Sequence, residues 1–165
     1  MSENNAVTLA DVYAGWGDFH QLLVKAVTPL TPEQLDLRAA AHLRTLRELA
    51  AHIARTRISW FHSLMGMGMG GAEYEELMTF DHPDKPAWDA AELVRGMETS
   101  WRLVLDSLSG WTIPDLEQKY EGTWDDEPYS LTRQWVIQHV LEHDHVHGGE
   151  LALTLGIHRL PAPEF

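Results

Sequence analysis

The 165-residue sequence contains no cysteine, and its 12 lysine and arginine residues are outnumbered by 25 acidic residues. Without cysteine, the chain can form no disulfide, no thiolate zinc site and no iron–sulfur cluster, so any metal it binds is held by nitrogen and oxygen atoms. The formal net charge is −13, and no basic stripe is present to neutralise a phosphate backbone. Nucleic acid is therefore not an expected partner.

Long hydrophobic runs are also missing. No window of about 18 residues is apolar and uncharged, and the first residues show neither a basic segment nor an apolar one of the kind that directs secretion. We therefore expect no membrane partner, and the cytoplasm is the default location. A 44% share of hydrophobic residues and 22% of charged residues is typical of a folded protein, and the length predicts one domain over residues 1–165.

Apolar residues recur at steps of three and four, which predicts helices. The predicted helices cover residues 9–27, 45–65, 89–108 and 130–155, with a short helical turn at residues 32–35. Thr8, Thr45 and Ser130 are the predicted N-caps, because a hydroxyl can accept a hydrogen bond from an amide of the first turn. Gly156 is the predicted left-handed stop of the last helix.

Two long segments separate these helices. Residues 66–88 are rich in glycine, methionine and proline, and residues 110–130 carry proline, aromatic and acidic residues without a clear period. Both are predicted to be irregular connections, the second with a β-turn at Glu121 and Gly122. No convincing strand pattern is present. The predicted fold class is all-α, a four-helix bundle with long connections between helices two and three and between helices three and four.

The last predicted helix holds four of the ten histidines within nine residues, in the sequence QHVLEHDHVHGGE. His139, His143 and His147 are four residues apart, so they form one stripe along a helix, whereas His145 falls on the other side. Four apolar residues lie on or beside this stripe: Trp135, Val136, Val140 and Val146. We therefore predict that the histidine stripe faces the interior of the protein.

Two histidines at positions i and i+4 can chelate one metal ion, which makes the stripe a candidate metal site. His52, at the flank of the apolar face of the second helix, is best placed to supply a ligand from a facing helix. The alternative is a set of hydrogen-bonded core histidines, because a single H-x-x-x-H pair is a weak signal. The residues from His139 to His143 also match H-x-x-E-H, with Glu142 as a general base. That arrangement needs a further ligand well downstream, and only 22 residues follow His143.

These residues resemble the DinB/YfiT-like superfamily of small four-helix metalloproteins. The resemblance rests on His52 in LRELAAHI and on His143 and His147 in HVLEHDHVHGGEL, and it spans most of the chain. It implies that these three histidines bind a divalent metal ion, most often zinc or nickel, with iron and manganese as alternatives. It further implies that His139 supports the metal ligands without binding the ion, and that the protein is a homodimer.

The sequence departs from the family pattern after the last ligand. Gly148 and Glu150 stand where the family often has arginine and glutamine. Glu150 lies one turn beyond His147 on the same stripe. Its carboxylate is therefore a candidate to accept an imidazole N–H, to bind the metal or to act as a base.

The resemblance implies a metal-dependent enzyme with a small-molecule substrate, and similar proteins include S-transferases that use bacillithiol or mycothiol. A low-molecular-weight thiol suits a chain without cysteine, because the metal would activate the incoming sulfur as a thiolate. Glu150 and Glu142 are the candidate catalytic residues, which would orient ligands or shuttle protons. The alternatives are a metal-dependent hydrolase and a non-catalytic metal-binding protein. A fourth protein ligand would favour the non-catalytic protein.

Overall fold

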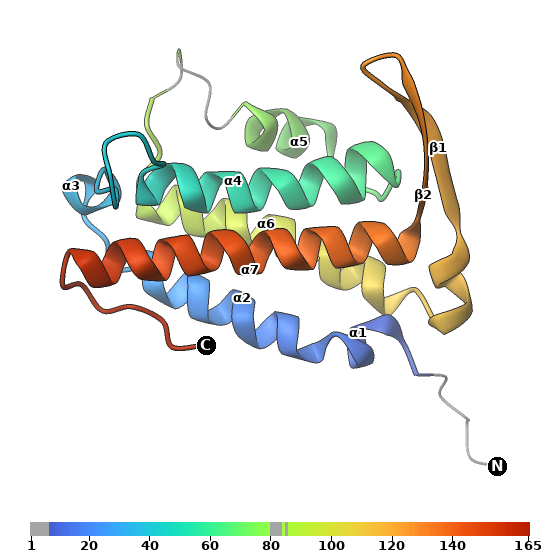
Figure 1. The fold of residues 1–165 in the computed structure, drawn as a ribbon, viewed down its shortest axis with the longest axis horizontal. Coiled ribbons are helices and arrows are strands. Elements are labelled where there is room, and N and C mark those ends of the chain that lie inside the picture. Colours follow the sequence, from blue (N-terminus) through green and yellow to red (C-terminus); the bar gives the residue numbers. More distant parts are fainter. Residues whose placement is uncertain (1–6, 80–83, 85) are drawn as a thin grey trace.

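Helices make up most of this protein, as a computed structural model shows for residues 7–79, 84 and 86–165 (Figure 1). The longest helices lie side by side: α2 (Ala14–Val27), α4 (Leu46–Ile58), α6 (Ala90–Ser109) and α7 (Arg133–Ile157). α4 packs against both α6 and α7, and α2 packs against α6. Within the described ranges, no helix has both the length and the apolar composition needed to cross a membrane.

The predicted caps set most of the helix starts. Thr45 caps α4 and forms the predicted capping box, in which its hydroxyl accepts from the amide of Glu48 and the Glu48 carboxylate accepts from the amide of Thr45. Thr8 caps a first short helix, α1 (Leu9–Val12). A break at Tyr13 separates α1 from α2, so the first predicted helix consists of two helices. The predicted turn at residues 32–35 is α3 (Pro32–Leu35).

The predicted ends of the last helix are wrong. Ser130 lies in a β-strand, and the N-cap of α7 is Thr132, whose side chain accepts a hydrogen bond from the amide of Trp135 at 3.2 Å. Gly156 lies within α7, and the left-handed residue after the helix is Arg159, with φ 57°. The strand ends only where Thr132 can take over as the cap, so the helix starts later than the hydroxyl pattern suggested.

Both predicted irregular connections contain regular structure. α4 continues into a π-helical turn (Ser59–Leu64), and the first connection then forms α5 (Gly71–Met78), with Leu77 buried. Parts of that connection, residues 80–83 and 85, lie outside the described residues. The second connection forms a 3-10 helix (Ile113–Glu117) and an antiparallel hairpin of β1 (Lys119–Trp124) and β2 (Glu127–Thr132). In Figure 1 this hairpin stands at one end of the helices.

The turn of the hairpin is not at Glu121 and Gly122, as predicted, but at Asp125 and Asp126. These two residues have φ values of 49° and 66°, which is the backbone of a type I′ turn. Asparagine followed by glycine is the usual signal for that turn, and two aspartates are a weak substitute, so the sequence pattern did not reveal it.

Gly148 lies at the place where α7 approaches α2. A Cβ atom on Gly148 would lie 2.5 Å from Cζ of Phe19 and 3.1 Å from Cδ2 of Leu23, whereas one on the neighbouring Gly149 would meet nothing within 4 Å. We expect Gly148→Ala to lower the free energy of unfolding by about 1–3 kcal/mol, because overpacking forces the helices apart. Gly149→Ala is the matched control and is expected to raise it by about 0.5–1 kcal/mol. Urea denaturation measures both, and equal stability of the two variants would contradict this account.

Candidate metal centre

α7 places its histidines beside its core face and not on it. The residues that α7 buries most fully follow a stripe one position further along: Val136, Val140, Asp144, Gly148, Leu151 and Leu155. Val136 and Val140 are buried as predicted, but Trp135 and Val146 are 45% and 59% exposed, so the prediction was wrong for these two. The histidine stripe consequently lies at the border between the core and the surface, where a buried site can still be reached from outside.

Three imidazoles meet between α4 and α7. The ring centroids of His52, His143 and His147 are separated by 4.7, 4.7 and 4.3 Å, and one nitrogen of each ring lies within 4.8 Å of the others. Nε2 of His143 is 2.9 Å from Nε2 of His52. All three rings are half-buried. The structure thus brings together the three histidines that the sequence singled out.

The protonation state of His143 suits a metal ligand. Its pKa is lowered to about 3, mainly by burial and also by the neighbouring His147 and His52. The imidazole is therefore neutral at pH 7 and offers a lone pair. The hydroxyl of Thr56 lies 3.2 Å from Nε2 of His143, while Nδ1 is buried without a hydrogen-bond partner among the described residues.

The two predicted catalytic carboxylates occupy different positions. Oε2 of Glu150 lies 2.6 Å from Nδ1 of His147. When the carboxylate accepts Nδ1–H, the lone pair of Nε2 is left for a ligand role, which is a usual arrangement around metal-bound histidine. Glu142 is exposed and accepts a hydrogen bond from Nε2 of Gln138 at 2.8 Å. The structure thus brings Glu150 to the histidines and does not bring Glu142 there.

His139 packs among tryptophans next to the site. Its ring stacks on Trp135 with centroids 4.9 Å apart and planes 9° apart, and it meets Trp60 edge-on at 4.6 Å. In the described part of the chain, the group of possible ligand atoms contains only His52, His143 and His147. Neither His139 nor Glu150 belongs to this group.

A family model described as the DinB superfamily matches residues 18–151 of the chain. The protein belongs to the DinB superfamily. A DinB-like protein from Bacillus cereus ATCC 10987 has a similar fold, with a TM-score of 0.73 and 22% sequence identity over 96% of this chain and 97% of that one. A conserved protein from Enterococcus faecalis is also similar, with a TM-score of 0.67 and 16% identity over 92% and 99% of the two chains. No curated protein matches the sequence.

Sequence reasoning missed a second polar cluster of this DinB-superfamily protein, buried between the helices. Oδ2 of Asp144 accepts hydrogen bonds from Nε1 of Trp16 at 2.7 Å and from Nε of Arg57 at 2.8 Å. The Arg57 guanidinium also donates to Nδ1 of His20 at 3.1 Å. The side chains of Arg57 and Asp144 are completely buried. A signal was present, because Arg57 follows Ile53 and Asp144 follows Val140 by one helical turn on apolar faces.

His20 is neutral within this cluster. Its pKa is lowered to about 3, mainly by burial and also by the positive charge of Arg57. Arginine is only a donor, so Nδ1 of His20 accepts and Nε2 carries the proton. The contact between Nε2 and Oε2 of Glu98, at 3.3 Å, is therefore a hydrogen bond between an uncharged ring and a carboxylate and not an ion pair.

The lowered pKa of His20 predicts a loss of stability in mild acid. Its pKa falls from 6.5 to about 3 on folding, so the unfolded chain binds one more proton than the folded chain between these values. The contribution of neutral His20 to the free energy of unfolding is fully present well above pH 6.5. Below pH 6.5 it falls by up to about 1.4 kcal/mol per pH unit. Urea denaturation between pH 7 and 5 measures this slope. In the His20→Gln variant, the slope of stability against pH should be shallower by the equivalent of about one proton. Equal slopes in the two proteins would refute the assignment.

Proposed function

We propose that this DinB-superfamily protein binds one divalent metal ion through His52, His143 and His147 and acts as a metal-dependent enzyme. Transfer of a low-molecular-weight thiol is the first candidate reaction, and hydrolysis is the second. The observation that carries the proposal is the meeting of three imidazoles from two helices, with no fourth ligand atom in this group among the described residues. Structural zinc sites usually have four protein ligands, whereas catalytic sites keep a position open.

The donor set fits a first-row metal ion. Imidazole nitrogen suits zinc, nickel and iron, and the chain has no thiolate to compete for the ion. A divalent ion held by three neutral ligands keeps its full charge and lowers the pKa of a water molecule or thiol that binds to it. Because the chain lacks cysteine, a reacting thiol would arrive with the substrate.

The remaining residues orient the site and hold protons. Glu150 accepts the Nδ1–H of His147 and so fixes the tautomer of that ring. We assign proton transfer to Glu150, because its carboxylate is half-exposed and touches a ligand ring. Glu142 would exchange a proton only with solvent from its present position.

We further infer that α2, α4, α6 and α7 form a four-helix bundle and that the protein is a cytoplasmic homodimer. The side-by-side arrangement of these helices supports the first inference (Figure 1), and the resemblance to the DinB/YfiT-like family supports the second. Light scattering on the purified protein tests the dimer, and a monomeric mass across the working concentration range would exclude it.

The deciding experiment is metal analysis followed by an activity screen. Protein purified without an affinity tag should carry about one first-row metal ion per chain by plasma mass spectrometry. The variant with His52, His143 and His147 all changed to alanine should carry none. Metal-loaded protein is then assayed for conjugation of bacillithiol and mycothiol to an electrophile and for hydrolysis of esters and amides. Bound metal without either activity would favour a metal-binding protein, and absence of metal after incubation with zinc, nickel and manganese would end the proposal.

A further inference from the structure

A groove runs along the outer face of α4 and its π-helical continuation and passes the metal centre. This cavity has a volume of about 940 Å³, which is large enough for a cofactor-sized molecule. Arg44 lines it just before the first turn of α4, His52 and Thr56 line it near the middle, and Trp60 lines it beyond the last turn. At 1.5 Å per residue, Arg44 and Trp60 are separated by roughly 24 Å along the helix axis. The histidine centre thus lies between two distant ends of the same groove.

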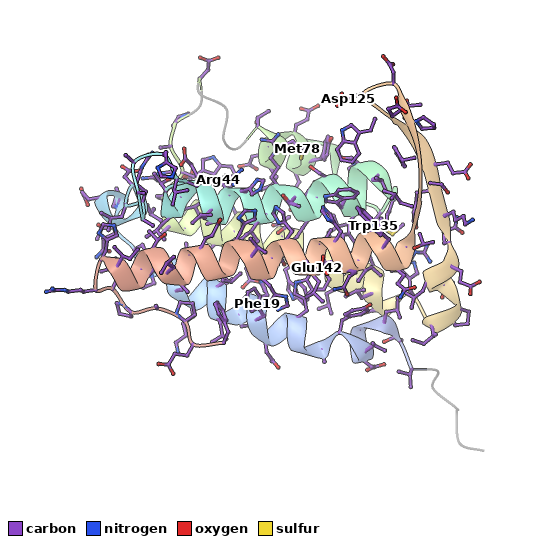
Figure 2. The ribbon with its side chains drawn as sticks, in the orientation of Figure 1. Phe19, Arg44, Met78, Asp125, Trp135 and Glu142 are labelled. Atoms are coloured by element: carbon purple, nitrogen blue, oxygen red, sulfur yellow. The ribbon has the colours of Figure 1, made fainter. Side chains whose placement is uncertain are left out.

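One end of the groove is positively charged. Arg44 and Arg47 line it next to Glu48, whereas Arg55 lines the groove beyond His52. Arg47 has a structural role, because it donates to Asp36 and to the carbonyl of Pro32. Arg44 is exposed, and its side chain forms no hydrogen bond or ion pair within the described part of the chain. Figure 2 shows Arg44 at the start of α4.

The other end of the groove is aromatic. Trp60 lies at its floor and is almost buried, while Trp124 reaches it from β1 and is 58% exposed. The two ring centroids are 5.7 Å apart, and Tyr129 of β2 stands 6.4 Å from Trp124. Exposed tryptophan beside buried tryptophan offers a flat group a surface on which to stack.

We propose that the groove binds a small molecule with an anionic group at one end and a flat aromatic group at the other. A carboxylate or phosphate would be held by Arg44, because guanidinium pairs with these groups through parallel hydrogen bonds. The flat group would stack on the exposed face of Trp124, because the rings of Trp60 and Trp124 are too close to each other to admit another ring between them. The middle of the molecule then lies beside His52, and for that reason the identification of this molecule as the substrate rests on the proposed function.

A fluorescent probe with the same two features tests the groove. The probe is 11-(dansylamino)undecanoate, whose long flexible chain separates the carboxylate from the naphthalene ring, added to the zinc-loaded full chain, and the matched neutral probe is its methyl ester. We expect saturable binding of one carboxylate probe per chain, and at least tenfold weaker binding of the neutral probe. Arg44→Gln should weaken binding of the carboxylate probe about tenfold, and Arg44→Lys should weaken it less. Arg102→Gln, an exposed arginine on α6 that does not line the groove, should leave it unchanged.

Two further measurements complete the test. Trp124→Ala should weaken binding of the probe about tenfold if the flat group stacks on Trp124. Competition by 12-phenyldodecanoate and by 12-phenyldodecyl phosphate distinguishes carboxylate from phosphate, and the tighter competitor identifies the anion. Equal affinity of the probe for Arg44→Gln and Arg102→Gln, or equal affinity of the wild type for the charged and neutral probes, would overturn the proposal.

Metal analysis separates this inference from the proposed function. Arg44→Gln should keep one metal ion per chain, so weaker probe binding in that variant does not reflect a lost metal. Conversely, the triple histidine variant lacks the proposed ligands but retains Arg44 and Trp124. If the wild type carries no metal and the probe still depends on Arg44, the groove assignment stands while the enzyme assignment falls.

Discussion

Replacement of His143 by alanine is expected to remove the metal while leaving a folded helical protein. His143 is one of the three proposed ligands, with its ring within 4.7 Å of His52 and 4.3 Å of His147. Mutating a residue that hydrogen-bonds to a metal ligand typically lowers metal affinity by roughly 10–100-fold. The loss of one of three direct ligands should therefore weaken metal binding by at least about a hundredfold. The fold should survive, because the core face of α7 is made by other residues and Nδ1 of His143 is buried without a partner.

Plasma mass spectrometry and far-ultraviolet circular dichroism measure the two halves of this expectation. His145→Ala is the control, because His145 is exposed on the same helix and contacts the ring of Phe19. That variant should retain one metal ion per chain. Stoichiometric metal in His143→Ala, together with a normal helical spectrum, would remove His143 from the ligand set.

Loss of Arg57 is expected to cost more stability than any other single change considered for this chain. Arg57 on α4 and Asp144 on α7 are fully buried, with Nη2 and Oδ2 2.7 Å apart. Arg57→Met would leave the carboxylate of Asp144 buried and uncompensated, which costs about 3–5 kcal/mol. Trp16 would then be the one residue still donating to that carboxylate among the contacts described. Urea denaturation at pH 7 measures the loss.

The double variant Arg57→Met/Asp144→Leu is the control for this prediction. Replacing both members of a buried ion pair by apolar residues is often neutral or stabilising, so the double variant should recover most of the loss. If Arg57→Met does not fold, its failure alongside a folded double variant carries the same meaning. If the free energy of unfolding of Arg57→Met is less than about 1 kcal/mol below that of the wild type, the buried pair is not needed for stability.

Most of the helices could be predicted from the sequence, because their starts follow from local chemistry. Thr45 and Glu48 satisfy each other's backbone within four residues, and nothing distant is needed to form that cap. The break at Tyr13 carried no such signal. α5 was also missed, because the glycine- and methionine-rich residues just before it, 66–70, resemble a loop and α5 buries only Leu77 fully.

The core face of α7 was misplaced by one residue, for a physical reason. Its buried stripe contains Asp144 and Gly148, one paired with Arg57 and the other packed under Phe19. Neither residue registers as apolar, so the valines flanking the histidines appeared to mark the core. Both departures depend on residues from distant helices, and a periodicity in one segment cannot show them.

The site itself was more accessible to sequence reasoning than the groove beside it. His52, His143 and His147 are chemically distinctive and lie at helical spacing, so their meeting follows from helix geometry. The groove has Arg44 near one end and Trp124 near the other, and these residues are 80 positions apart in the sequence, with Trp124 on a hairpin. Eight of the twelve strand residues of that hairpin are exposed and none is fully buried, so its strands lack the apolar alternation by which strands are recognised.

Because its residues are so exposed, the hairpin has a lower local stability than the helices. β1 and β2 bury no residue fully, and Asp125 and Asp126 at their turn hold a left-handed backbone that costs roughly 1–2 kcal/mol for each residue. A segment with so little buried surface opens locally far more often than the helices unfold. Amide hydrogens of the hairpin should therefore exchange with solvent much faster than those of α4. A molecule stacked on Trp124 could then leave through the aromatic end of the groove while the three histidines stay in place.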